Sequence, residues 1–350
     1  MNRKQFLSSA LVAGAAIPAW AADSGDDDIQ KTLIIPRYLQ PGDTIGITSP
    51  AGYITLQDIQ PAVQQMQSWG FNIKIGSTIG KRDFTFGGTD AERAADFQQL
   101  LDDDSVKAIM CARGGYGAVR IIDNINFGKL LLHPKWIIGF SDITVFHSHL
   151  NHHYGIASIH SKMCNSFPDD WSKAEPIQME TILSIKQALL GEQMRYTALP
   201  NEKNKPGVAE GVLVGGNLKT LESLAGSASD LSTSGKILFV EDTGEYLYSI
   251  DRMFWGLKRT GKLAGLRGLI IGGFKIKPDD DPDEAFGKNL QDIVLTICAA
   301  YNYPVCFDFP VGHQRKNYAL KCGVLHRLTV KKEEVILKEI NGQAKNKITL

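Results

Sequence analysis

The chain has 350 residues, a length that favours two domains rather than one. Its 43% hydrophobic content is ample for folded cores and argues against intrinsic disorder. Lysine plus arginine and aspartate plus glutamate both number 38, so the positive charge typical of a nucleic-acid-binding protein is missing. We therefore expect a small-molecule partner.

The first residues have the features of a targeting segment. Arg3 and Lys4 precede an apolar stretch over 6–17, and Ala19-Trp20-Ala21 fits a cleavage site. We predict a signal peptide over residues 1–22 and an exported, periplasmic protein, with a membrane anchor as the alternative interpretation. The second arginine of a twin-arginine signal is missing, so the export route stays open. No later segment approaches the length of a membrane span.

From residue 44 onward, short apolar runs alternate with longer amphipathic ones, which is typical of an α/β fold with a parallel sheet. Thr89, followed by two acidic residues, has the pattern of a helix N-cap. The predicted strands cover 44–48, 71–75, 106–111, 136–140 and 157–160, and the predicted helices cover 56–69, 89–101, 119–125 and 141–152.

A polar connector that contains a helix follows over 166–207 and ends in a stretch with the composition of an exposed loop. We expect it to separate an N-terminal domain at 30–165 from a C-terminal domain at 208–350. The second domain should mix β structure with a few helices. Its predicted strands cover 210–214, 236–240 and 269–274, with short ones from 306 onward, and its helices cover 218–224, 250–259 and 289–300.

Neither the cysteines nor the histidines predict a metal site. The five cysteines show no CxxC spacing, which argues against zinc fingers, redox motifs and a disulfide framework. Four histidines gather at His147, His149, His152 and His153, but no carboxylate follows at ligand spacing. We interpret them as a solvated helix end and expect neither a metal nor another cofactor.

Polar turns directly follow several of the predicted strands, and in an open parallel sheet such turns line the binding crevice. Ser141 stands where the strand at 136–140 passes into a helix, the position of a nucleophile elbow. Its alternative role is a helix N-cap. The glycine-rich segment 113–117 follows the preceding strand and offers unobstructed backbone N–H groups for an oxyanion. A tight turn and a phosphate cradle are the alternatives, although the Lys-Ser/Thr pair of a phosphate loop is absent.

Two further polar residues suit the same chemistry. Glu241 follows a strongly apolar strand and could orient an imidazole, or else form a salt bridge or cap a turn. His313 lies in a turn, where a histidine suits a general base, although a lone histidine is usually structural. Taken residue by residue, the pattern predicts an α/β enzyme of hydrolytic type.

Together, six segments in this order resemble the LD-carboxypeptidase family of serine peptidases, which includes muramoyltetrapeptide carboxypeptidases and microcin C self-immunity peptidases. They cover most of 41–324. The segments are Pro41-Gly-Asp-Thr-Ile-Gly-Ile-Thr-Ser-Pro-Ala51, Ala112-Arg-Gly-Gly-Tyr-Gly117, Ile138-Gly-Phe-Ser-Asp-Ile-Thr144, Gly211-Val-Leu-Val-Gly-Gly-Asn217, Phe239-Val-Glu-Asp242 with Ile250-Asp-Arg252, and Phe309-Pro-Val-Gly-His313.

The resemblance implies a nucleophile at Ser141 and a triad completed by Glu241 and His313. It places the oxyanion donors on the backbone N–H groups of Gly115 and Asp142. The implied activity is release of terminal D-Ala from a murein tetrapeptide, without a metal.

The resemblance also implies a fold. It has a flavodoxin-like N-terminal domain, a smaller β-rich C-terminal domain, the active site between them, and assembly as a homodimer. Arg113 is a candidate for binding the product-side carboxylate, and Tyr116 in the same loop is a second candidate substrate contact. Ser161-Lys162 stands where many relatives have Gly-Pro, which leaves the details of the substrate loop open.

Two other functions remain as alternatives. One is a peptidase with the same machinery that acts on another peptide or on an aminoacyl-nucleotide, although export argues against this substrate. The other is a periplasmic protein that binds cell-wall fragments without cutting them, since a cleft between two domains would suit binding as well.

Overall fold

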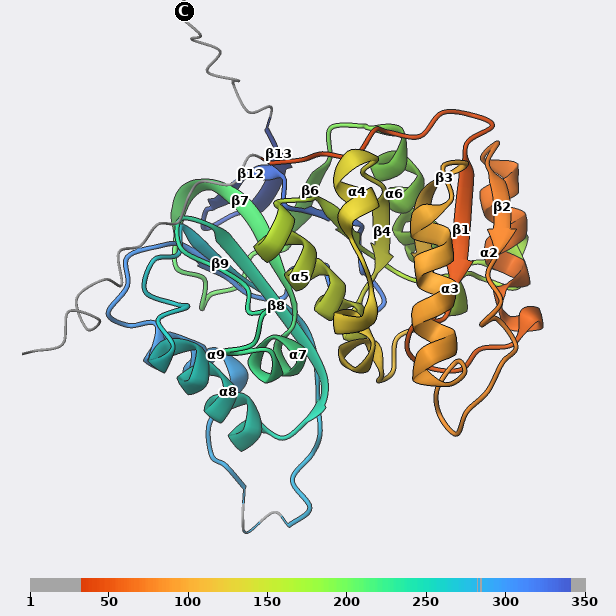
Figure 1. Cartoon of the computed structure of the whole chain (residues 1–350). Coiled ribbons are helices and arrows are strands. Elements are labelled where there is room, and N and C mark those ends of the chain that lie inside the picture. Colours follow the sequence, from red (N-terminus) through yellow and green to blue (C-terminus); the bar gives the residue numbers. More distant parts are fainter. Residues whose placement is uncertain (1–32, 282, 284, 341–350) are drawn as a thin grey trace, which may run out of the picture. The chain divides into compact units, whose positions relative to one another are not determined.

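The computed structural model describes residues 33–281, 283 and 285–340. The predicted signal peptide at 1–22 lies outside the described residues. From Thr44 onward the chain alternates strands and helices, as the sequence predicts, and the strands form two sheets (Figure 1).

The first sheet has six strands in the order β11-β5-β4-β3-β1-β2. Five of them pair in parallel, in the flavodoxin-like order 2-1-3-4-5, and β11 joins the edge antiparallel to β5. This confirms the predicted fold class of the N-terminal half. The strands are β1 (Thr44–Thr48), β2 (Asn72–Ile75), β3 (Val106–Cys111), β4 (Trp136–Gly139), β5 (Ser158–His160) and β11 (Leu320–Cys322).

Helices cover both faces of this sheet because successive strand residues point to opposite sides. Ile109 and Ile137 pack with α3, α4 and α5, which stand in front of the sheet in Figure 1, whereas Met110 and Ile138 pack with α2 and α6. The helices are α2 (Leu56–Ser68), α3 (Asp90–Asp102), α4 (Gly128–Leu132), α5 (Thr144–Tyr154) and α6 (Pro176–Leu190). Thr89 caps α3 as predicted, in a capping box with Glu92.

The predicted helix at 119–125 is wrong. Two short 3₁₀ turns replace it, at Ala118–Arg120 and Ile122–Asn124. The segment contains β-branched residues followed by Asp123 and Asn124, and these residue types compete poorly for a regular helix. The backbone therefore closes i→i+3 bonds and returns to an extended conformation at Ile125.

The second sheet has seven strands in the order β10-β9-β8-β7-β12-β13-β6. Strands β7 to β10 pair in parallel and the others are antiparallel, so this half mixes strands and helices as predicted. The strands are β6 (Arg195–Ala198), β7 (Gly207–Asn217), β8 (Ile237–Glu245), β9 (Gly268–Ile276), β10 (Val305–Cys306), β12 (Leu325–Val330) and β13 (Val335–Glu339). Helices α7 (Leu218–Ser223), α8 (Leu247–Arg259) and α9 (Leu290–Ile297) share one core with this sheet.

Segments of the chain cross between the two sheets. The connector supplies α6, which packs on the first sheet through Ile182 and Ile185, and β6, which pairs with β13 in the second. In the other direction, β11 from the C-terminal half completes the first sheet. One continuous hydrophobic cluster contains residues of both sheets, so the two sheets pack against each other.

The cysteines and two of the four clustered histidines are interior residues. All five cysteines are buried and unbonded. The expectation of a solvated helix end is wrong for His147 and His149, which are buried in α5. His147 contacts the Ser158 hydroxyl at 2.8 Å and the Gly139 carbonyl at 2.9 Å, and burial lowers its pKa to about 3.

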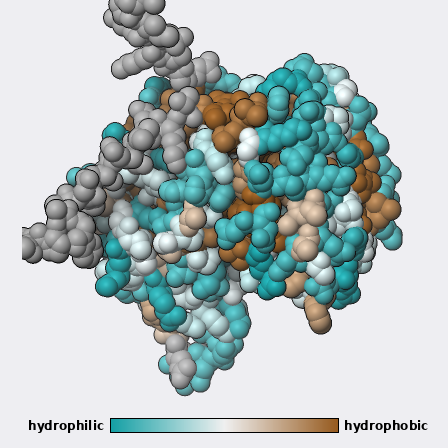
Figure 2. All heavy atoms as spheres, viewed as in Figure 1, coloured by the Kyte–Doolittle hydropathy of each residue, from teal (hydrophilic) through white to brown (hydrophobic). Residues whose placement is uncertain are grey.

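The surface is mainly hydrophilic on the face drawn in Figure 2, with a hydrophobic area over α4, where Leu131 and Leu132 are exposed. None of the helices in the described part of the chain is both long and apolar enough to cross a membrane.

Candidate active site

Ser141 has a strained backbone at the end of β4. Its φ is +62°, a left-handed conformation that only two other non-glycine residues share in the described chain. This conformation costs about 1–2 kcal/mol for an L-residue. The alternative role as an N-cap is not observed, because Phe140 and Ile143 hold the cap positions and neither turn has a side-chain cap. A strained serine between strand and helix has the geometry of a nucleophile elbow.

Glu241 and His313 form a hydrogen-bonded pair. His313 Nδ1 lies 2.5 Å from Glu241 Oε2. A carboxylate only accepts hydrogen bonds, so Nδ1 carries the proton and Nε2 is left with a lone pair. Glu241 is fully buried, and burial alone would raise its pKa. The imidazoles of His160 and His313 outweigh that effect and hold the pKa at about 2, so the carboxylate stays ionised.

Glu241 lies inside β8, not after the end of a strand as the sequence suggests. The register of β8 against β9 shifts between Val240 and Asp242, because β9 carries one extra residue there. Gly272 and Gly273 occupy this part of β9. Such bulges re-aim side chains and are frequent beside active sites.

Gly312 lets the histidine turn approach the carboxylate. Its φ is +95°, and a Cβ at this position would lie 2.3 Å from Glu241 Cβ and 2.7 Å from Glu241 Oε2. The Gly312 N–H donates to Asn317 Oδ1 at 2.8 Å, which holds the turn in place. Glycine before His313 is therefore a steric requirement of the pair.

His160 is a buried histidine that the sequence did not single out. Its Nε2 lies 3.8 Å from Glu241 Oε1, beyond hydrogen-bonding distance, and both ring nitrogens and Oε1 lack a hydrogen-bond partner in the described structure. The ring contacts Phe140 and Phe239 edge-on. Glu241 thus stands between two imidazoles, of which only His313 is bonded to it.

The glycine-rich loop lies against the serine, as expected for an oxyanion loop. A Cβ at Gly114 would lie 3.1 Å from Ser141 Cβ and 3.3 Å from its Oγ, whereas one at Gly115 would contact only Gly52. Gly114 is therefore the glycine that faces Ser141. Gly115, with φ of +103°, shapes the loop.

Asp142 ties the serine turn to the same loop. Its carboxylate accepts a hydrogen bond from the Ala118 N–H at 2.7 Å. Burial raises the pKa of Asp142 to about 6. Arg113 and Tyr116 are both exposed, with Arg113 donating to the Tyr53 carbonyl at 2.9 Å.

The two halves of the site are held together through Thr144 and Asn217. Thr144 Oγ1, one turn after the serine, accepts from the Asn217 N–H at 2.9 Å. Asn217 Nδ2 in turn donates to Asp242 Oδ1 at 2.9 Å, next to Glu241. A Cβ at Gly216 would lie 2.4 Å from Thr144 Oγ1, so only glycine permits this approach.

The structure brings Glu241 and His313 together and places Ser141 close to them without joining it. The Phe140 ring, next to Ser141 in the chain, lies 5.0 Å from the His313 ring between centroids. Among the described residues no hydrogen bond connects Ser141 to His313. Of the three residues implied by the resemblance, Glu241 and His313 are thus bonded, and Ser141 is next in the chain to a ring that contacts His313.

Comparison with known proteins shows the family of this chain. The model of the LD-carboxypeptidase N-terminal domain matches residues 45–161, and that of the LD-carboxypeptidase C-terminal domain matches residues 210–328. The chain belongs to the LD-carboxypeptidase family. It is therefore a peptidase by family.

Relatives in the LD-carboxypeptidase family match most of the chain. A probable murein peptide carboxypeptidase of Bacillus subtilis is 32% identical over 82% of this chain and 89% of its own. A murein tetrapeptide carboxypeptidase of Pseudomonas aeruginosa is 28% identical over 80% of this chain and 91% of its own. The crystal structure of a muramoyltetrapeptide carboxypeptidase from Oxalobacter formigenes has a TM-score of 0.74 at 27% identity, covering 85% of this chain and 99% of the other.

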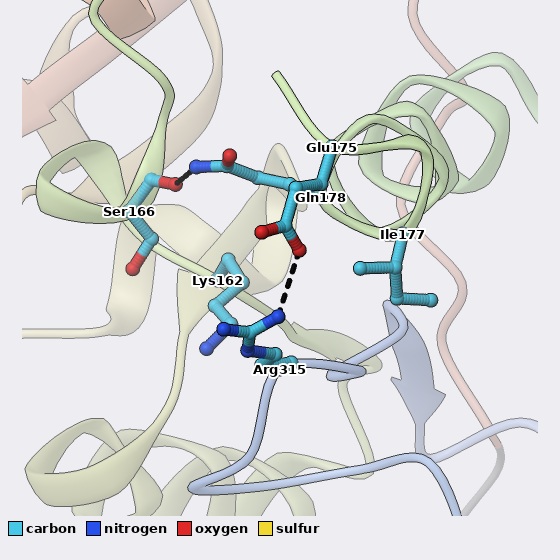
Figure 3. A pocket seen from close by; sticks show the side chains of 6 residues that line it. All are labelled: Lys162, Ser166, Glu175, Ile177, Gln178 and Arg315. Atoms are coloured by element: carbon cyan, nitrogen blue, oxygen red, sulfur yellow. Dashed lines mark hydrogen bonds and ion pairs between the residues drawn. The ribbon is translucent and has the colours of Figure 1, made fainter. Parts of the chain in front are cut away.

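A pocket of about 390 Å³ is lined in part by residues that follow His160 and His313 in the chain. Lys162, two residues after His160, and Arg315, two residues after His313, both line it. Figure 3 shows Arg315 directed to Glu175, with Lys162 in the same part of the view. The only signal for Lys162 in the sequence is its place where many family members have Gly-Pro.

Proposed function

We propose that the chain is a serine carboxypeptidase that releases terminal D-Ala from a murein tetrapeptide. The scissile amide would join the L-centre of diaminopimelate to D-Ala. The observation that carries the proposal is the strained Ser141 at φ +62° beside the buried Glu241–His313 pair. The names of relatives 28–32% identical to the chain support the choice of substrate.

In the proposed mechanism, His313 Nε2 removes the proton from the Ser141 hydroxyl as the oxygen attacks the amide carbon. Glu241, already ionised and bonded to Nδ1, stabilises the imidazolium that forms. His313 then gives the proton to the leaving amine, and water hydrolyses the acyl-enzyme. Catalytic hydrogen bonds often form only in the substrate complex, so a serine not yet bonded to His313 is consistent with this role.

The oxyanion would be bound by backbone N–H groups of the two turns that meet at Ser141. Asp142 and Gly115 are the donors implied by the resemblance, and Gly114 supports them by its contact with Ser141. Each such donor typically contributes ~3 kcal/mol to transition-state stabilisation. The exposed Arg113 and Tyr116 on the same loop are proposed substrate contacts.

We further propose that the protein is exported to the periplasm through the signal peptide at 1–22 and acts there as a homodimer. Cell fractionation of the full chain and light scattering of the mature protein would test these two points. A cytoplasmic location would contradict the first point, and a monomer would contradict the second.

Ser141→Ala tests the nucleophile. We expect loss of D-Ala release with unchanged unfolding, because no hydrogen bond of the Ser141 hydroxyl is found in the described structure. Ser223→Ala, which alters an exposed serine on α7, is the matched control and should keep full activity.

Free D-Ala would be followed by mass spectrometry with tripeptide, tetrapeptide and pentapeptide substrates. Turnover by Ser141→Ala at the wild-type rate would remove Ser141 from the mechanism. Tight binding by the wild-type protein without release would instead support the binding-protein alternative. Hydrolysis of an aminoacyl-nucleotide, without D-Ala release from any of the peptides, would support the alternative peptidase that acts on that substrate.

A further inference from the structure

Lys162 is held directly beside the catalytic pair. Its Nζ donates to the Gln314 carbonyl at 3.0 Å, one residue after His313. The same ammonium lies 5.5 Å from the centroid of the Phe140 ring, which also contacts His313. The ammonium is therefore bonded to the histidine turn, and Lys162 also lines the pocket drawn in Figure 3.

The surroundings of Lys162 favour an anion. Partial burial lowers its pKa, nearby Lys275 lowers it further, and Glu241 partly offsets both. The charge of Glu241 is already engaged with His313. The hydrogen bond to Gln314 uses one of three N–H groups on the ammonium, and no second hydrogen bond of the Lys162 ammonium is found among the described residues.

The second cationic side chain at the pocket, Arg315, forms only an exposed ion pair. Arg315 pairs with Glu175 at 2.8 Å, but their side chains are 80% and 59% exposed. Ion pairs this exposed contribute little to stability. The guanidinium can therefore turn from Glu175 to a ligand in the pocket at little cost.

We propose that this pocket is a carboxylate-binding subsite, with Lys162 as the specificity-determining residue and Arg315 as its partner. The inference rests on the proposed peptidase function and adds the recognition of a substrate charge. A volume of about 390 Å³ lies within the range of small-molecule sites, roughly 300–1,000 Å³. Two substrate carboxylates lie close to the scissile bond, that of terminal D-Ala and the free one of diaminopimelate.

Lys162 has a competing structural role, because its bond to Gln314 also anchors the histidine turn. The two roles differ in kinetics. An anchor affects catalysis with every substrate, whereas a carboxylate site affects KM only for substrates that carry the bound carboxylate. The test therefore compares substrates as well as variants.

We would measure kcat and KM of Lys162→Met with three peptides. These are the tetrapeptide, its C-terminal amide, and an analogue with lysine in place of diaminopimelate. We expect KM for the tetrapeptide to rise at least tenfold with kcat changed less than threefold. The increase should vanish for the amide if the D-Ala carboxylate is bound, or for the lysine analogue if the diaminopimelate carboxylate is bound.

Lys258→Met is the matched control, since Lys258 is also partly buried and donates to a backbone carbonyl at 3.0 Å, that of Ile297. It should leave all three KM values unchanged. An equal KM increase of Lys162→Met for all three peptides, or a loss in kcat alone, would overturn the subsite and support the anchoring role.

Calorimetry separates this inference from the proposed function. Tetrapeptide would be titrated into Ser141→Ala with and without Lys162→Met, which requires no turnover. A tenfold weaker Kd in the double variant supports the subsite even if the wild-type protein releases no D-Ala. An unchanged Kd would refute the subsite even if D-Ala is released.

Discussion

Gly312→Ala should destabilise the protein and separate His313 from Glu241. The alanine Cβ would lie 2.3 Å from Glu241 Cβ and 2.5 Å from Glu241 Cγ, far inside van der Waals contact. Glu241 is fully buried in the sheet and is bonded to His313 through Oε2. The turn that carries His313 must therefore shift away from it.

The magnitude follows from two contributions. The left-handed φ of +95° costs an alanine about 1–2 kcal/mol, and overpacking at a rigid contact costs about 1–3 kcal/mol. We expect the free energy of unfolding to fall by about 2–5 kcal/mol. A displacement of about 1 Å at a catalytic group lowers turnover roughly 100-fold, so D-Ala release should fall by at least that factor.

Gly261→Ala isolates the steric contribution. Gly261 also has a positive φ, +78°, but a Cβ there would meet nothing within 4 Å. It should lose only about 1–2 kcal/mol and keep its activity. Urea unfolding and D-Ala release would be measured for both variants. If Gly312→Ala loses no more stability than Gly261→Ala and turns over normally, the steric argument for this glycine is wrong.

Two further predictions concern buried ionisable groups. His160→Leu should lower kcat at least tenfold with KM unchanged and should move the acidic limb of the pH–rate profile to higher pH, because His160 helps keep the pKa of Glu241 low. His160→Gln, which can donate a hydrogen bond to Glu241, should restore much of the lost kcat. An unchanged pH–rate profile in His160→Leu would contradict this role of His160. Asp142 has a pKa raised by burial to about 6, so the folded state binds more protons than the unfolded state between about pH 4 and 6, and stability falls as pH rises through that window. Asp142→Asn should remove about 2 kcal/mol of this pH dependence between pH 4.5 and pH 7.5 in urea unfolding, and a pH dependence equal to that of the wild type would contradict the raised pKa of Asp142.

Much of the fold could be predicted because its strands are short apolar runs bounded by turn residues. The run at 106–111 is strand β3 as predicted, and the capping pattern at Thr89 begins α3. The segment 119–125 was mispredicted because its apolar residues are buried in short turns whose local i→i+3 bonds leave no periodic signal. The predicted strand over 210–214 ends before Gly215 and Gly216, yet β7 continues through these glycines to Asn217.

The site residues could be predicted only where a residue type has few alternative structural roles at its place in the sequence pattern. A serine at a strand-to-helix turn and a histidine after glycine can be recognised locally, and the structure places both beside the interface of the two sheets. His160 and Lys162 were not predicted as site residues, because their importance depends on the residues that they contact in the folded chain. Glu241 is 81 positions after His160, and Gln314 is 152 positions after Lys162.

The position of Ser141 relative to His313 depends on contacts between the two sheets rather than within one of them. Ser141 follows a strand of the first sheet, and Glu241 lies on a strand of the second. Asn217 of β7 forms a polar link between them, because its N–H donates to Thr144 at the start of α5 and its side-chain amide donates to Asp242 of β8. Because each bond is 2.9 Å long and buried, sliding one sheet against the other would leave unpaired polar groups in the core. The same link therefore helps to fix the position of Ser141 relative to His313, the proposed nucleophile and base.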